Sequence, residues 1–142
     1  MAYQAKKQKR FVEDFQLVDE NDNIFKTLHV KLSADDMLAK INRKYTVLCQ
    51  TLAETNEIKH KVQSNKEIGD CLEKLGNAVV NLFEAVFGEE DTKTIVEFYE
   101  NRYTEMCQEV VPFISNIVIP RITEIKKQNQ KKLLKPYRKH RR

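Results

Sequence analysis

The chain has 142 residues, of which 41% are hydrophobic and 32% charged, with only three Gly and three Pro. This length suffices for one domain with its own core, and the low Gly and Pro content favours a largely helical chain. No run of about 18 apolar residues occurs, so we expect no membrane-spanning segment. The polar, basic N-terminus lacks the apolar stretch of a signal peptide, which makes a cytosol the expected location.

The net charge of +4 conceals an uneven distribution along the chain. Residues 1–10 hold four basic groups and residues 126–142 hold nine, and neither segment contains an acid. Residues 11–125 carry all 21 acids against 12 basic residues, a formal charge of −9. This pattern predicts a flexible basic arm (1–10), a single helical domain with an N-terminal hairpin (11–125) and a basic C-terminal extension (126–142).

Two strand-like segments, 11–18 and 24–32, follow the basic arm. One face of the second would carry Ile24, Lys26, Leu28, Val30 and Leu32. Residues 19–23 (DENDN) are turn formers, so the two segments are expected to form a β-hairpin. A lone hairpin is marginally stable in water, so this one must lie on the helices or add to another sheet. His29 is interpreted as a surface or cross-strand residue and not as a ligand.

Ser33 is expected to start the first long helix, where Asp36 three residues later resembles the partner in a capping box. The following apolar stripe, which steps by three and four, consists of Leu38, Ile41, Tyr45, Leu48 and Leu52. It spans about two heptads, so it predicts a core-facing helix and not a coiled coil. Between Glu54 and Glu67 the apolar content falls, and either a solvated continuation or a break near residues 64–65 fits this composition.

The segment from Leu72 to Ile119 holds most of the large apolar residues, and we interpret it as the centre of the fold. Its spacing predicts a helix ending at Gly88, where left-handed backbone is favoured. Asp91 is expected to cap a second helix, and the short turn between them favours an antiparallel pair. The second helix would carry one stripe, with Arg102 as its polar exception, made of Ile95, Phe98, Tyr99, Arg102, Met106 and Val110.

Glycine and proline mark further features of these helices. Gly69 and Gly76 sit seven residues apart on one face, which indicates either close approach of another helix or a weak helix start. Pro112 and Pro120 each remove a backbone donor. We therefore expect a kink near Val110–Val111, a short apolar segment at 113–119 and a final helix starting at about Pro120.

No pattern in the chain indicates catalysis, a cofactor or a small-molecule substrate. There is no Gly-rich phosphate loop and no nucleophile motif with a paired histidine. The run of Glu89, Glu90 and Asp91 is better explained as helix-start charge than as a metal cluster. We therefore predict a protein that is not an enzyme.

Cys49, Cys71 and Cys107 are odd in number, widely spaced and in no CxxC pair. They are interpreted as free thiols packed as small hydrophobes in a reducing compartment. Because no histidine stands at ligand spacing to them, no zinc site is expected.

The basic extension is the strongest functional signal, and it is the predicted partner-binding segment. Its basic residues are Lys126, Lys127, Lys131, Lys132, Lys135, Arg138, Lys139, Arg141 and Arg142. It could bind nucleic acid phosphates, although it lacks the repeated aromatics of a stacking platform. It could equally bind an acidic protein surface, including that of another copy, or serve only to keep the protein soluble. We expect the extension to be dispensable for folding and needed for a partner contact.

Three stretches carry a resemblance to a known family: FQLVDENDNIFKTLHVKL, then FGEEDTKTIVEFYENRYTEM within the helical body, then VVPFISNIVIPRI before the lysine-rich end. In this layout, over most of the chain, the protein resembles the tail assembly chaperones of tailed phages and prophages of Gram-positive bacteria. The resemblance implies a non-enzymatic protein in the cytoplasm of a bacterial host that escorts the tape-measure protein or another tail component, with possible self-association. A minor virion structural protein and a nucleic-acid-binding accessory protein are the alternatives.

The predicted fold is mainly α with an N-terminal β-hairpin, and thus α+β. It comprises three to five helices in a compact body, with a kinked C-terminal helix that leads into a basic tail.

Overall fold

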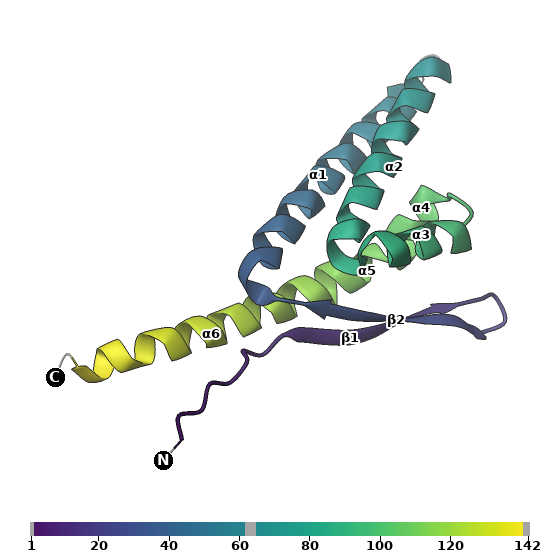
Figure 1. The fold of residues 1–142 in the computed structure, drawn as a ribbon. Helices are drawn as coiled ribbons and strands as arrows, with labels where there is room; N and C mark the ends of the chain where they lie inside the picture. The colour runs from purple at the N-terminus through teal and green to yellow at the C-terminus, as the bar shows by residue number, and fades with distance from the viewer. Residues whose placement is uncertain (1, 62–64, 141–142) are drawn as a thin grey trace.

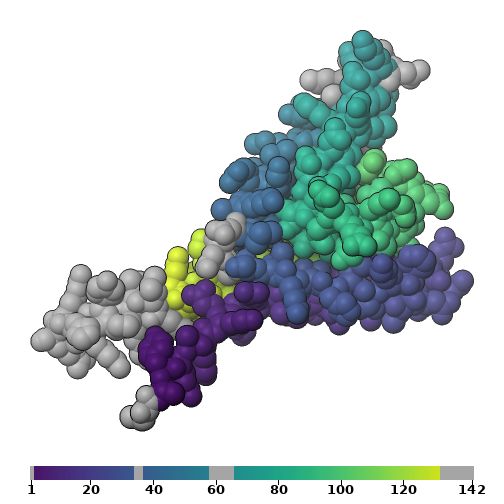
Figure 2. Space-filling model, viewed as in Figure 1, coloured from purple at the N-terminus to yellow at the C-terminus, as the bar shows by residue number. Residues whose placement is uncertain are grey.

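The computed structural model describes residues 2–61 and 65–140, with side chains described for 2–33, 37–57 and 66–131. The elements are β1 (Phe11–Val18), β2 (Ile24–Leu32), α1 (Ala34–Lys61), α2 (Asn65–Phe87), α3 (Glu89–Phe98), α4 (Tyr103–Glu109), α5 (Val111–Phe113), the π-helical η1 (Ile114–Val118) and α6 (Ile119–His140). The predicted α+β architecture, with its N-terminal hairpin and bent C-terminal helix, is confirmed (Figure 1). In the space-filling view, α1 and α2 form an arm that projects from the rest (Figure 2).

The N-terminal hairpin forms as the sequence predicts, with β1 antiparallel to β2. Of the face predicted for β2, Leu28, Val30 and Leu32 are buried, whereas Ile24 and Lys26 are exposed. In β1, Phe11 and Leu17 are buried. The hairpin lies on the helices, because Glu13 pairs with Arg121 of α6 and the Arg121 guanidinium lies 5.5 Å from the Phe11 ring centroid. The predicted cross-strand role of His29 is also confirmed, since its Nδ1 lies 2.7 Å from Asp14 Oδ1.

The first two helices, α1 and α2, form a long helical pair. The structure describes α1 to Lys61 and α2 from Asn65, and the two helices pack against each other, so the chain reverses direction between them (Figure 1). Residue 64, near which one alternative placed the break, lies outside the described residues. In the predicted α1 stripe, Ile41 and Leu48 are fully buried and the other members are half-buried. The helix begins directly after Ser33, while the expected capping partner Asp36 lies outside the described side chains.

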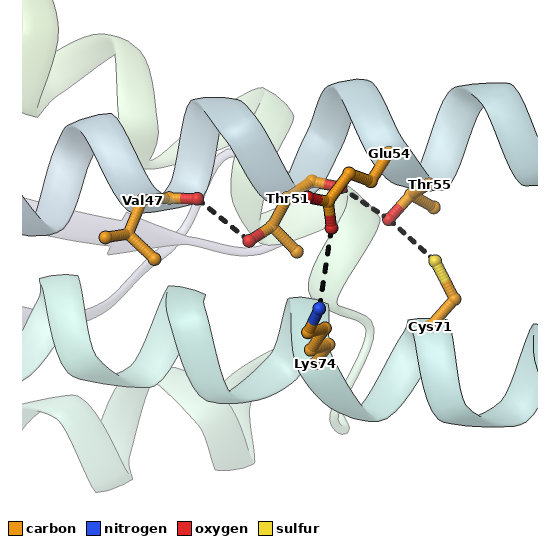
Figure 3. A network of polar contacts seen from close by, with 6 residues as sticks. All are labelled: Val47, Thr51, Glu54, Thr55, Cys71 and Lys74. Atoms are coloured by element: carbon orange, nitrogen blue, oxygen red, sulfur yellow. Dashed lines mark hydrogen bonds and ion pairs between the residues drawn. The ribbon is translucent and has the colours of Figure 1, made fainter.

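A polar seam joins α1 to α2 inside their interface (Figure 3). The Thr51 hydroxyl donates to the Val47 carbonyl at 2.8 Å, and the Thr55 hydroxyl donates to the Thr51 carbonyl at 2.8 Å. The Cys71 thiol of α2 then donates to Thr55 Oγ1 at 3.1 Å. Because each buried threonine hydroxyl donates to a carbonyl one turn earlier, neither is left unpaired at the interface.

Gly88 separates α2 from α3, as predicted. Its φ of 86° and ψ of 167° place it in a region that is essentially restricted to glycine. The prediction that Asp91 caps α3 is wrong, because the helix already begins at Glu89 and Gly88 is its N-cap, with no side-chain capping bond. The three acidic residues 89–91 instead occupy the first turn, where the helix dipole favours negative charge.

The prediction of one long helix after α2 is wrong. The following helix ends at Phe98, and Glu100 and Asn101 adopt left-handed φ values of 53° and 63°. The helix α2 contacts both α3 and α4, and it packs more extensively against α1. The chain therefore turns before α4, and Arg102 precedes that helix instead of interrupting an apolar stripe.

Gly76 and Gly69 have different explanations. A Cβ atom on Gly76 would lie 2.8 Å from the Tyr103 ring of α4, so close approach explains this glycine. A Cβ atom on Gly69 would meet nothing within 4 Å, so close packing does not explain Gly69.

The segment that contains Pro112 and Pro120 departs from a straight α-helix, as predicted. The chain breaks helical regularity at Val110, and Pro112 stands in the first turn of α5. The apolar segment that follows forms η1, a π-helical turn that leads directly into α6 at Ile119. Pro120 is the second residue of α6, directly after this π-helical turn, where its missing N–H and its ring favour a kink in the helical run. These features produce the bend in the C-terminal helix (Figure 1).

The three cysteines are free, as predicted: Cys71 is buried, Cys107 is partly exposed and Cys49 is exposed. Cys49 therefore does not pack as a small hydrophobe, which corrects that part of the prediction. Burial raises the pKa of the Cys107 thiol to about 11, so the reactive thiolate is scarce at neutral pH.

We expect that adding a thiol reductant will leave the melting temperature unchanged, because no disulfide constrains the unfolded chain. Thermal unfolding monitored by circular dichroism, with and without dithiothreitol, checks this expectation. A fall of several degrees with reductant would reveal a stabilising disulfide and contradict the structure.

Candidate functional site

A cleft of about 580 Å³ lies where the closed end of the hairpin meets α3 and α4. We call it the hairpin-end cleft, and its lining residues are Val18, Asp19, Glu20, Asn21, Phe98, Tyr99, Glu100, Arg102, Glu105 and Glu109. The volume falls in the range of about 300–1,000 Å³ that is common for binding sites. The hairpin and the α3–α4 region lie beside each other in Figure 2, with the hairpin in purple and blue and the helices in green.

The hairpin turn supplies one wall of the cleft, and Asp19 organises that turn. Its Oδ1 accepts hydrogen bonds from the backbone N–H groups of Asn21 and Asn23, both at 2.9 Å. The Asp19 N–H also donates to the Asn23 carbonyl at 2.9 Å, and Asp22 adopts a left-handed φ of 63°. The polar run that predicts a turn therefore also fixes carboxylates at the edge of the cleft.

A β-bulge leaves apolar side chains exposed next to the cleft. Leu17 pairs with Lys26 and Val18 pairs with Ile24, so Phe25 is an extra residue in β2. Phe25 is 62% exposed and Ile24 57% exposed, although the Phe25 ring centroid lies 5.2 Å from that of Phe98. We call Val18, Ile24 and Phe25, which are all exposed, the apolar rim.

The turn between α3 and α4 supplies the opposite wall. The Asn101 N–H donates to the Val96 carbonyl and the Arg102 N–H to the Tyr99 carbonyl, each at 3.1 Å. These bonds hold the left-handed residues at Glu100 and Asn101 and direct the chain into α4. Tyr99, before the turn, and Glu105, after it, consequently line the same cleft.

The electrostatic character of the cleft is acidic. Five of its lining residues carry carboxylates, and Arg102 is the one basic residue among them. The Arg102 guanidinium lies 3.6 Å from a Glu100 oxygen and 3.8 Å from a Glu105 oxygen. Burial, followed by the negative charges of Glu109 and Glu105, raises the pKa of the Tyr99 hydroxyl. The cleft therefore favours cationic groups over anionic ones.

The predicted partner-binding residues from Lys126 to Lys139 lie on α6, which crosses residue 126 without interruption and runs to His140. Lys126 is half-buried, and Lys127 and Lys131 are exposed. The side chains of Lys132, Lys135, Arg138 and Lys139, and both Arg141 and Arg142, lie outside the described part of the chain. Packing of α6 extends past the predicted boundary, since Asn129 is buried.

The last residues of the basic arm lie beside the first part of α6, which the sequence did not show. A second cleft, of about 400 Å³, joins the basic arm to α6 and is lined by Lys9, Arg10, Val12, Arg121, Glu124, Ile125 and Gln128. The end of α6 and the hairpin turn lie at opposite ends of the molecule (Figure 1). The described structure thus has an acidic cleft at one end and gathers basic residues toward the other.

Sequence reasoning missed the hairpin-end cleft, because its walls come from segments about 80 residues apart. One available signal was the acidic density of residues 97–109, where Glu97, Glu100, Glu105 and Glu109 accompany a single arginine. Pairing that segment with the DENDN turn required the tertiary structure.

Within the described residues, no group of three His, Cys, Asp or Glu side chains gathers as a metal-binding cluster. None of the helices in that part of the chain combines the length and apolar character that a bilayer-spanning segment needs. No family model, curated protein or solved structure matches the chain.

Proposed function

We propose that the protein is a non-enzymatic protein–protein interaction module in phage tail assembly, which chaperones the tape-measure protein or another tail component. The observation that carries the protein-binding part is the apolar rim beside the hairpin-end cleft. Exposed apolar groups that lie together beside a cleft are typical of interaction surfaces. The layout resemblance described above supports the phage tail context.

The rim is suited to a helical client protein. Ile24 and Phe25 offer apolar area, while the carboxylates of the neighbouring cleft attract cationic residues that flank a client's apolar face. Burial of a Phe or Ile side chain contributes about 1.5–3 kcal/mol, so two such residues can anchor a complex.

The test is co-expression of the full chain with a tape-measure protein as the candidate client, followed by co-purification. We expect the double variant Ile24→Ser/Phe25→Ser to reduce the client recovered at least tenfold, because it removes the apolar anchors. The matched control is Val47→Ser/Leu72→Ser, whose parent residues are 46% and 42% exposed on the α1–α2 arm. Equal loss in both variants, or unchanged recovery with the rim variant, would reject the proposal.

A nucleic-acid-binding accessory function is the second candidate, because Lys9, Arg10 and Arg121 line one cleft and Lys127 and Lys131 are exposed farther along α6. Phosphate binding by these groups would weaken steeply with salt. An electrophoretic shift of generic DNA at low salt that disappears at moderate salt would favour this candidate. An absent shift at both salt concentrations would reject it.

A further inference from the structure

We propose that the hairpin-end cleft and its apolar rim bind the basic segment 126–142 of a second copy of the chain, so that copies associate head to tail. This contact rests on the proposed protein-binding role of the surface, with a second copy of the chain as the bound partner. Self-association is measured separately from the binding of a tail component in the co-purification test.

Charge complementarity selects this occupant. The cleft presents the carboxylates of Asp19, Glu20, Glu100, Glu105 and Glu109 around one arginine. Segment 126–142 contains nine basic residues and no acid. Opposite potentials of this kind bring partners together and fix their relative orientation.

The apolar rim adds exposed apolar area next to the charged cleft. Val18, Ile24 and Phe25 are 43%, 57% and 62% exposed, and Phe98 and Tyr99 contribute half-buried aromatic rings beside them. The basic segment also contains Leu133, Leu134 and Tyr137. A partner segment with both cationic and apolar residues can therefore match both properties of the surface.

The positions of the two surfaces require the contact to be intermolecular. The 22-residue helix α6 is about 33 Å long, at 1.5 Å per residue, and it runs away from the hairpin turn (Figure 1). The basic segment therefore cannot reach the cleft of its own chain. Because the two contacting surfaces differ, repetition of the contact generates rings or open filaments and not a closed symmetric dimer.

Charge-swap variants of the full chain test the proposal. The cleft variant is Glu105→Lys/Glu109→Lys, and the tail variant is Lys131→Glu/Lys135→Glu. A combined variant carries all four changes and keeps the parent's formal charge of +4. The matched control is Glu57→Lys/Asp70→Lys, which alters two exposed acids of the α1–α2 arm and has the same net charge as the cleft variant.

Sedimentation velocity at several protein concentrations, in about 50 mM and about 500 mM salt, measures association. We expect the parent and the control to exceed the monomer mass of 16.8 kDa at low salt and to dissociate at high salt, because exposed charges are screened. The cleft and tail variants should each associate at least tenfold more weakly. Both an equimolar mixture of these two and the combined variant alone should recover association.

Three results would overturn the proposal: a parent that stays monomeric at low salt, a control that is impaired as much as the cleft variant, or no recovery in the mixture. Circular dichroism of each variant verifies folding before its association is interpreted. The tail variant leaves both the cleft and the apolar rim unchanged, so client recovery with this variant separates failure of self-association from failure of the proposed function.

Discussion

Phe83→Ala is expected to lower the free energy of unfolding by about 3–5 kcal/mol, the cost typical of removing a buried aromatic ring. Phe83 is 0% exposed on α2, and its ring centroid lies 5.9 Å from that of Phe87 in an edge-on arrangement. Phe87 in turn contacts Phe15 of β1 and Phe113 of α5. The substitution therefore leaves a cavity beside an aromatic cluster that joins the hairpin to the helices.

Urea unfolding followed by circular dichroism measures this effect. The matched control is Phe25→Ala, which removes the same ring at a position that is 62% exposed and should change stability by less than about 1 kcal/mol. Phe98→Ala should fall between the two, because Phe98 is only half-buried at the cleft. Equal stabilities for Phe83→Ala and the parent would mean that α2 does not pack as described.

Phe11→Ala is expected to destabilise the protein by a similar amount, about 3–5 kcal/mol, and to release the hairpin from α6. Phe11 is 0% exposed, pairs with Leu32 in the sheet and lies under the Arg121 guanidinium. Because a two-stranded hairpin is marginal by itself, loss of this anchor should expose its backbone amides to exchange.

Hydrogen exchange resolved along the chain, together with urea unfolding, measures this second effect. We expect β1 and β2 amides to exchange at least tenfold faster in Phe11→Ala while α1 and α2 remain protected. Val12→Ala is the control, since Val12 is the next residue and is 55% exposed. Unchanged exchange in the hairpin would show that contacts other than Phe11 hold it on the helices.

The candidate site was only partly predictable. The charge pattern identified segment 126–142 and the acidity of the remaining chain, because both are properties of composition. The cleft itself was not predictable, since it joins the Asp19 turn to Glu105 and Glu109 across most of the chain. The bulge at Phe25 also escaped prediction, because alternation put Ile24 on the same face as the buried Leu28, whereas Ile24 is 57% exposed.

The sequence by itself determined the features that depend on a few neighbouring residues. Alternation and the DENDN turn specified the hairpin, Gly88 provided the backbone conformation that ends α2, and Pro112 and Pro120 marked the bend into α6. These outcomes follow from hydrogen-bond donors, allowed φ values and side-chain periodicity, which act within about one turn.

Only the tertiary structure decided which apolar faces meet. A stripe of apolar residues indicates that one face of a helix is buried, but it does not identify the element that covers this face. The sequence therefore left both α1 and α3 as neighbours of α2, and in the structure α2 packs most extensively against α1. The same reason explains Gly76, whose missing side chain is needed only because Tyr103 of α4 lies against it. It also explains the separation of charge, because α6 runs beside the basic arm and away from the acidic cleft.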